Sequence, residues 1–177
     1  LNKLNAALQE RMLEIDAVVG LDLPVHPAVG SAVRDGDLAS ALNTLAITSP
    51  SKRVAQLARK LAQVAGGTKV EVVNNLKGAD GTPAAGLFDP QTNTIKLDAT
   101  TGINPHTILH ETTHAATSAT LSNSNHPMTK QLTKLFNDVK DSLGTYYGSQ
   151  NVDEFASEAF GNPDFQRELS RIYPDGS

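Results

Sequence analysis

The sequence predicts an α+β protein with helices at the N-terminus, a small mixed sheet in the middle and further helices at the C-terminus. Three observations predict this order. Apolar residues recur every three or four positions through the N-terminal third of the chain, as on helices that pack against a core. The period changes to two between residues 68 and 98, which is typical of strands. From residue 105 onward the helical period returns.

The N-terminal part, up to residue 66, is expected to be helical. A first helix covers residues 1–19, where six apolar side chains form one stripe, and Gly20 ends it. Residues 21–31 contain two prolines and no steady period, so we expect a connector there. A short helix through residues 38–45 follows, and a longer one over 51–65 ends at a pair of glycines.

The middle of the chain predicts a small mixed sheet. The segment "TKVEVVNN" alternates apolar and polar residues and reads as one strand. In "AAGLFDPQTNTIKLDA", two further short strands are joined by a turn at Asp89 and Pro90, with Asn93 beyond it. We expect the strand near 93–98 to lie at the edge of the sheet, where an extended peptide can pair with it.

The C-terminal part predicts three more helices. Asn104 and Pro105 form a good helix start, an N-cap residue followed by proline at the first helical position, and we expect the helix to span about 105–119. A second helix is expected around residues 128–143, and a third over 152–160, where "GNP" ends it.

Composition excludes several classes of function. At 177 residues the chain is expected to form one domain, residues 1–177. Its net charge of −4 offers no basic face to nucleic acid, and its sequence holds neither a membrane-spanning apolar run nor a secretory signal. Because it opens on Leu1 rather than Met, we expect a domain excised from a larger protein. Its compartment and oligomeric state stay undetermined.

A metal-binding motif lies on the helix expected at 105–119. With no cysteine in the chain, any transition metal must be held by imidazole and carboxylate groups. In "HETTH", His110 and His114 are four positions apart and share one helix face, while Glu111 between them can reach a water on the metal. The motif predicts one zinc ion held by both imidazoles, with Glu111 as general base.

A third protein ligand is required for a catalytic zinc site. Thr117 and Thr120 stand where a metzincin would need glycine and histidine, and no glutamate occurs between Glu111 and Glu154. Glu154 and Glu158 are one turn apart on the helix over 152–160, so both can face the metal helix. We expect Glu154 to be the third ligand. Glu158 is expected to fix the tautomer of a ligand imidazole from outside the metal's ligand shell.

Three aspartates and three apolar residues lie near these candidates in the sequence. The remaining nearby carboxylates are Asp138, Asp141 and Asp153. On the helix over 152–160, we expect Phe155, Ala159 and Phe160 to pack into the core.

Two further histidines were set aside as ligands. His106 lies one turn before His110, and its place in the first turn favours a surface or capping role. His126 lies in the loop after the motif helix, where a solvated histidine is common. A contact of either histidine with metal or substrate is the alternative to these roles.

The segment "YGSQNVDEFASEAF" resembles the catalytic domain of anthrax lethal factor and its relatives. In that family a tyrosine precedes the zinc-binding glutamate by seven residues, as Tyr147 precedes Glu154, and an aromatic residue and a second glutamate follow, as Phe155 and Glu158 do. The resemblance covers roughly the C-terminal half. It implies a zincin-like fold of the gluzincin class, with Tyr147 donating a hydrogen bond to the oxyanion and Tyr146 packing instead.

A weaker likeness joins the whole chain to metallopeptidase domains of large polyvalent proteins from phages and mobile elements. Aspzincins carry a competing pattern with an aspartate three residues before the tyrosine, where this chain has Gly144, so Asp141 is only a fallback ligand.

The sequence therefore predicts a zinc endopeptidase in which Glu111 activates a zinc-bound water against a peptide or protein substrate. The alternative is a zinc-binding structural or interaction module without turnover. Either function, the endopeptidase or the non-catalytic module, would suit a secreted effector or a phage-delivered protein.

Overall fold

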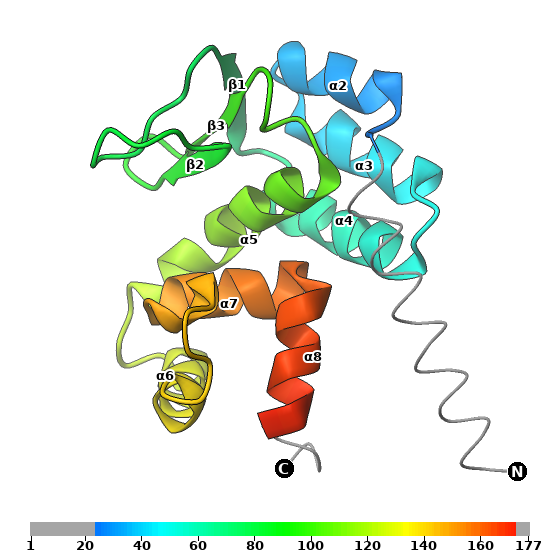
Figure 1. Ribbon diagram of the computed structural model, residues 1–177. Coiled ribbons are helices and arrows are strands. Elements are labelled where there is room, and N and C mark those ends of the chain that lie inside the picture. Colours follow the sequence, from blue (N-terminus) through cyan, green and yellow to red (C-terminus); the bar gives the residue numbers. More distant parts are fainter. Residues whose placement is uncertain (1–23, 173–177) are drawn as a thin grey trace, which may run out of the picture.

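A computed structural model describes residues 24–172 and shows the expected α+β architecture (Figure 1). The helix expected over residues 1–19 lies outside the described residues. The elements are α2 (Pro27–Arg34), α3 (Leu38–Thr48), α4 (Lys52–Ala65), β1 (Lys69–Val73), β2 (Gly86–Asp89), β3 (Thr94–Asp98), α5 (Pro105–Leu121), α6 (Pro127–Val139), the 3-10 turn η1 (Tyr147–Ser149), α7 (Val152–Gly161) and α8 (Pro163–Ile172).

Helix α2 corrects the expectation of a connector at residues 21–31. The side chain of His26 caps the helix, since its Nδ1 accepts a hydrogen bond from the backbone N–H of Ala28 at 3.2 Å. Pro27 occupies the first turn, where a proline removes no helical hydrogen bond. Here proline marks the start of a helix rather than a break.

The sheet has three strands in the order β1-β3-β2. Strand β2 pairs antiparallel with β3 through the expected hairpin, and β1 pairs parallel with the other side of β3. The strand near 93–98 is therefore central, and its expected place at the sheet edge is wrong. Strand β1 pairs with the side of β3 that was expected to be free, and Ile95 and Leu97 of β3 pack into the core with the helices. The strand left exposed beside α5 is β2.

Two groups of buried apolar side chains hold the fold together. One joins α2, α3 and α4 to the sheet and to Ile108 and Leu109 of α5. The other joins α6, α7 and α8 around Phe136, Phe155 and Phe165, whose rings pack edge-to-face. Helices α5 and α7 pack against each other between these groups (Figure 1). Each core thus fixes one side of the α5–α7 contact.

Helix α5 begins where the sequence predicts. The Asn104 side chain accepts a hydrogen bond from the N–H of Thr107 at 2.8 Å, and Pro105 is the first helical residue. Thr112 and Thr113 are buried in the middle of this helix, and their hydroxyls donate to the carbonyls of Ile108 and Leu109. These polar side chains are satisfied inside the helix itself.

The C-terminal helices differ from the expectation in their ends. Helix α6 stops at Val139, earlier than expected, and a turn with Gly144 at a φ of 59° leads to η1. Helix α8 is an addition to the expected elements, since "GNP" predicts only the end of α7. In fact Asn162 accepts hydrogen bonds from the N–H groups of Asp164 and Phe165 and so starts α8. No helix among the described residues is both long and apolar enough to span a membrane.

The Asp98 carboxylate holds the loop between β3 and α5. It accepts hydrogen bonds from the backbone N–H groups of Leu76, Thr101 and Thr100 at 2.9 to 3.0 Å, which lower its pKa from 3.8 to about 2. Because the folded state favours the charged form, this stabilisation is complete above a pH of about 4 and is lost as the pH falls towards 2.

We therefore expect Asp98→Asn to lower the thermal midpoint at pH 7, and the difference from the wild type to shrink by pH 3. Circular dichroism melts at both pH values check this. Asp141→Asn, an exposed aspartate after α6, is the control and should change neither midpoint. An Asp98→Asn effect of equal size at both pH values would contradict the assigned role.

Candidate metal centre

The two histidines of "HETTH" lie on one buried face of α5. The side chains of His110 and His114 are both shielded from solvent, and their Nε2 atoms are 3.1 Å apart. The one-turn spacing of an α-helix brings them together. Two imidazoles whose Nε2 atoms converge in this way leave a common point at which a cation can be shared.

Glu154 completes the group from α7. Its Oε2 atom lies 3.3 Å from the Nε2 of His110 and 3.3 Å from the Nε2 of His114. Asn151 positions this glutamate, because its side chain caps α7 by accepting a hydrogen bond from the N–H of Glu154 at 2.9 Å. The expected third ligand is therefore brought to the two histidines, and these three residues form a candidate metal site.

The size of this triangle fits a small tetrahedral metal ion. Two ligand atoms that are each about 2.05 Å from zinc, at the tetrahedral angle, lie about 3.3 Å from each other. The three observed separations are 3.1, 3.3 and 3.3 Å. The Oε2 of Glu154 is also buried without a hydrogen-bond partner among the described residues, although such an atom is normally satisfied. A metal at the centre would satisfy it.

Carboxylates also face the outer nitrogens of both histidines. The Oε1 of Glu158 lies 3.0 Å from the Nδ1 of His110, and its Oε2 accepts a hydrogen bond of 2.5 Å from the Asn162 side chain. The Oδ1 of Asp153 lies 3.3 Å from the Nδ1 of His114. A carboxylate in this position can hold an imidazole in the tautomer that presents its other nitrogen to a metal, although the Nδ1 of His110 and the Oδ1 of Asp153 form no hydrogen bond among the described residues.

Asp153 was missed as a partner of His114. In the sequence Asp153 is only a nearby carboxylate, because the one-turn pair on α7 is formed by Glu154 and Glu158. The feature of the sequence that could have indicated this contact is the position of Asp153 beside Glu154 in the first turn of α7. Both side chains reach the histidines of α5 from this turn. The direction of a side chain in a first turn depends on how two helices cross, which periodicity alone does not give.

The surrounding carboxylates change the electrostatics of the pair. Burial opposes protonation of both rings, but contacts with Glu154 and Glu158 raise the pKa of His110 to about 9. Likewise, contacts with Asp153 and Glu154 outweigh burial and raise the pKa of His114 to about 10. The carboxylates therefore favour a positive charge at both rings, which either a proton or a metal ion can supply.

Glu111 lies beside this group but is not part of the triangle. Its side chain is buried, and burial raises the pKa of its carboxyl, opposed by the two nearby histidines. The backbone of β2 passes directly over it, since a Cβ added to Gly86 would lie 2.6 Å from the Cγ and 2.8 Å from the Oε1 of Glu111. Only glycine fits at this point of β2.

Tyr147 faces the same group from η1. Its ring centre is 6.1 Å from that of His110, and 52 % of the residue is exposed. Partial burial raises the pKa of its hydroxyl, and the negative charges of Glu154 and Glu111 raise it further. Tyr146 points elsewhere and packs edge-on against Phe165, as expected, with ring centres 5.8 Å apart. Of the two adjacent tyrosines, Tyr147 is the one at the site.

The histidines that were set aside have different positions. His106 is half-buried with its ring centre 5.9 Å from that of His110, and His106, His110 and Glu158 form a second group with metal-ligand spacing. Burial lowers the pKa of His106. His126 instead caps α6, where its Nδ1 accepts a hydrogen bond from the N–H of Met128 at 3.2 Å.

The remaining carboxylates lie outside the group. Asp138 pairs with Lys134 at 2.7 Å on the surface of α6. Asp141, the fallback ligand, is exposed and belongs to neither group of potential ligands among residues 24–172.

Cavities open on both sides of the candidate metal site. A larger one, of about 830 Å³, lies between the 78–87 segment, His106, Tyr147 and Glu158. A smaller one, of about 170 Å³, extends past His114 along Leu87 and Phe88. Both are lined by Gly86, His110, Glu111 and Tyr147. The two cavities thus form a cleft that runs along β2 and past the histidines.

Comparison with models of known protein families finds no match to this chain, and comparison with curated proteins finds none either.

Gly86 offers a direct test of the packing around Glu111. Gly86→Ala should displace either β2 or the Glu111 side chain and lower the free energy of unfolding by about 1–3 kcal/mol, as overpacked cores do. Urea unfolding measures the loss. Gly67→Ala is the matched control, since an added Cβ there meets nothing within 4 Å. Equal stability of the Gly86 and Gly67 variants would show that β2 does not constrain Glu111.

Proposed function

We propose that the protein is a zinc-dependent endopeptidase of the gluzincin class. One observation carries the proposal: His110, His114 and Glu154 converge on a triangle of tetrahedral-zinc dimensions, with the buried carboxyl of Glu111 beside it. Two imidazoles and a carboxylate plus one open position are the usual ligand set of a catalytic zinc. The absence of cysteine fits this set.

Glu111 is the general base in this proposal. A zinc ion at the three ligands would supply Lewis-acid activation of water and of a peptide carbonyl. Glu111 is held close by β2, and its raised pKa suits a group that takes a proton and gives it up again near neutral pH. It accepts the proton of the attacking water and passes it to the leaving amine. In this proposal Glu158 orients the imidazole of His110, and Asp153 orients that of His114.

Tyr147 stabilises the oxyanion. Its half-exposed ring stands over the open side of the site, close to His110, and its raised pKa keeps the hydroxyl protonated as a hydrogen-bond donor. This arrangement supports the resemblance to anthrax lethal factor, in which a tyrosine and a glutamate seven residues apart serve these two roles. The polyvalent phage proteins remain the weaker likeness.

The substrate is an extended peptide that pairs with the free edge of β2. The sequence predicted that the free edge of the sheet lies at residues 93–98. In the structure β3 is central, and β2 is the edge strand that borders the cleft. Backbone hydrogen bonds to an edge strand hold a peptide in register while its side chains enter the cavities on either side. One such peptide bond would lie over Glu111.

Zinc content and cleavage together test this function. The purified chain should hold one zinc ion by mass spectrometry and cleave members of a peptide library. Glu111→Gln should keep the zinc, because Glu111 is not a ligand, and lower the cleavage rate by about 10²–10⁴-fold. One bound zinc with no cleavage of any library peptide by the wild type would instead indicate the non-catalytic binding module.

Tyr147 and Tyr146 form a matched pair for the oxyanion role. Tyr147→Phe should lower kcat by about 10²–10³-fold, as loss of one oxyanion donor does, with zinc content and KM little changed. Tyr146→Phe should leave kcat near the wild-type value, because that ring packs against Phe165. Similar kcat values for the two variants would rule out the role assigned to Tyr147.

A further inference from the structure

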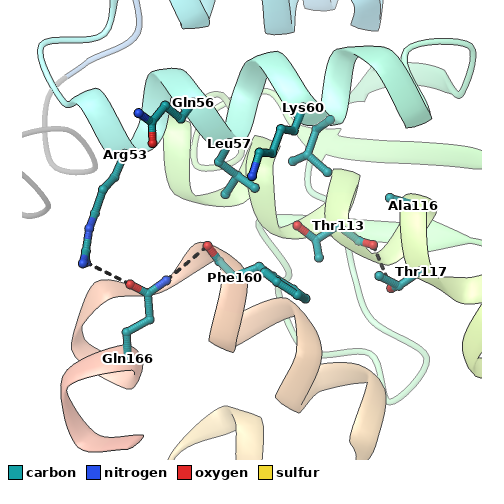
Figure 2. Close-up of a pocket in the computed structure, with 10 residues that line it drawn as sticks. Arg53, Gln56, Leu57, Lys60, Thr113, Ala116, Thr117, Phe160 and Gln166 are labelled. Atoms are coloured by element: carbon teal, nitrogen blue, oxygen red, sulfur yellow. Dashed lines mark hydrogen bonds between the residues drawn. The ribbon is translucent and has the colours of Figure 1, made fainter. Parts of the chain in front are cut away.

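A separate groove lies on another side of helix α5 (Figure 2). It has a volume of about 440 Å³ and is lined by side chains of α4, α5, α7 and α8. It shares none of its lining residues with the candidate metal site. Nothing in the proposed peptidase function uses this groove.

The groove carries two positive charges. Arg53 and Lys60 of α4 line it, and no aspartate or glutamate does. Neither cation forms an ion pair with a carboxylate among residues 24–172. Arg53 donates a hydrogen bond of 3.1 Å to the neutral Gln166 side chain instead. In a chain whose net charge is −4, a groove lined by two cations and no anion is complementary to a negatively charged ligand.

The two charges lie at different places along the groove. Arg53 and Lys60 are seven residues apart on α4, which separates their backbones by about 10 Å. In Figure 2, Arg53 extends from α4 across one end of the groove to Gln166 of α8, whereas the Lys60 side chain points from α4 towards Phe160. Two carboxylates spaced along a chain match this arrangement better than one compact anion does.

Apolar surface lies between the charges. The sequence predicted that Phe160 packs into the core, and this prediction is wrong: 51 % of the residue is exposed at the end of α7. It lies one position beyond the core-facing Ala159 and so turns towards the groove. Leu57 of α4 lies across from Phe160 (Figure 2). An occupant must therefore bring apolar side chains as well as acidic ones.

We propose that this groove docks a polypeptide segment of a partner protein, in which two acidic residues flank apolar ones. Its carboxylates pair with Arg53 and Lys60, and its apolar side chains cover Phe160 and Leu57. In an extended chain, side chains four positions apart face the same side and are about 13 Å apart, a span that the long side chains of Arg53 and Lys60 can reach, so the sequence pattern is acidic, three apolar residues, acidic. The docking does not depend on the proposed peptidase activity.

An NMR titration tests the docking. The probe is a short peptide in which two glutamates flank three leucines, added to the ¹⁵N-labelled full chain. We expect saturable amide shifts centred on groove residues such as Ala116 and Thr117, and none with a peptide in which lysines replace the glutamates. Mass spectrometry of the mixture confirms that the peptide stays intact during the measurement.

Charge-reversal variants locate the binding. Arg53→Glu with Lys60→Glu should weaken peptide binding by about tenfold or more, since two ion pairs become repulsions. The control combines Arg59→Glu on α4 with Lys130→Glu on α6; both residues are exposed, neither lines the groove, and the net charge change is the same. This control should bind as the wild type does.

Three results would overturn the proposal. The first is the absence of saturable shifts, the second is equal weakening in the two double variants, and the third is the same shifts with inorganic phosphate alone. The last result would mean that the groove takes a small anion rather than a polypeptide.

Discussion

The convergence of three ligand atoms between α5 and α7 is the interaction on which the rest of the structure depends. The Nε2 atoms of His110 and His114 and the Oε2 of Glu154 lie 3.1 to 3.3 Å apart. Buried groups of this kind are costly unless they are paired or coordinate a metal. Around them, Glu158 and Asp153 add negative charge behind each imidazole. One divalent cation at the centre would offset most of this negative charge and would satisfy the Oε2 of Glu154, which accepts no hydrogen bond among the described residues.

Much of the fold exists to hold this contact. One apolar core ties α5 to the N-terminal helices and the sheet, and the other ties α7 to α6 and α8. The caps at Asn104 and Asn151 fix where each helix begins, and hence which side chains face across the interface. The close approach of β2 at Gly86 then limits where Glu111 can lie. The candidate site and the groove beside α4 carry opposite charges. Carboxylates surround the site, whereas Arg53 and Lys60 line the groove and no carboxylate does.

Local rules predicted most of the fold and of the candidate site. Helical spacing brought His110, Glu111 and His114 together, and the one-turn pair on α7 gave Glu154 and Glu158, because both depend only on helix geometry. Contacts between distant parts of the chain were harder to predict from the sequence. The position of β3 depended on where β1 would pair, and the direction of Asp153 depended on the crossing of two helices. Helices α2 and α8 were missed for a local reason, because proline was read as a break although it also starts helices.

The location of bound zinc tests the central claim most directly. A crystal structure of the zinc-loaded chain, with anomalous data at the zinc edge, would show which atoms hold the metal. We predict one ion about 2.0–2.2 Å from the Nε2 atoms of His110 and His114 and from a carboxylate oxygen of Glu154. An ion bound by His106, His110 and Glu158 instead, or no zinc at either group, would contradict it.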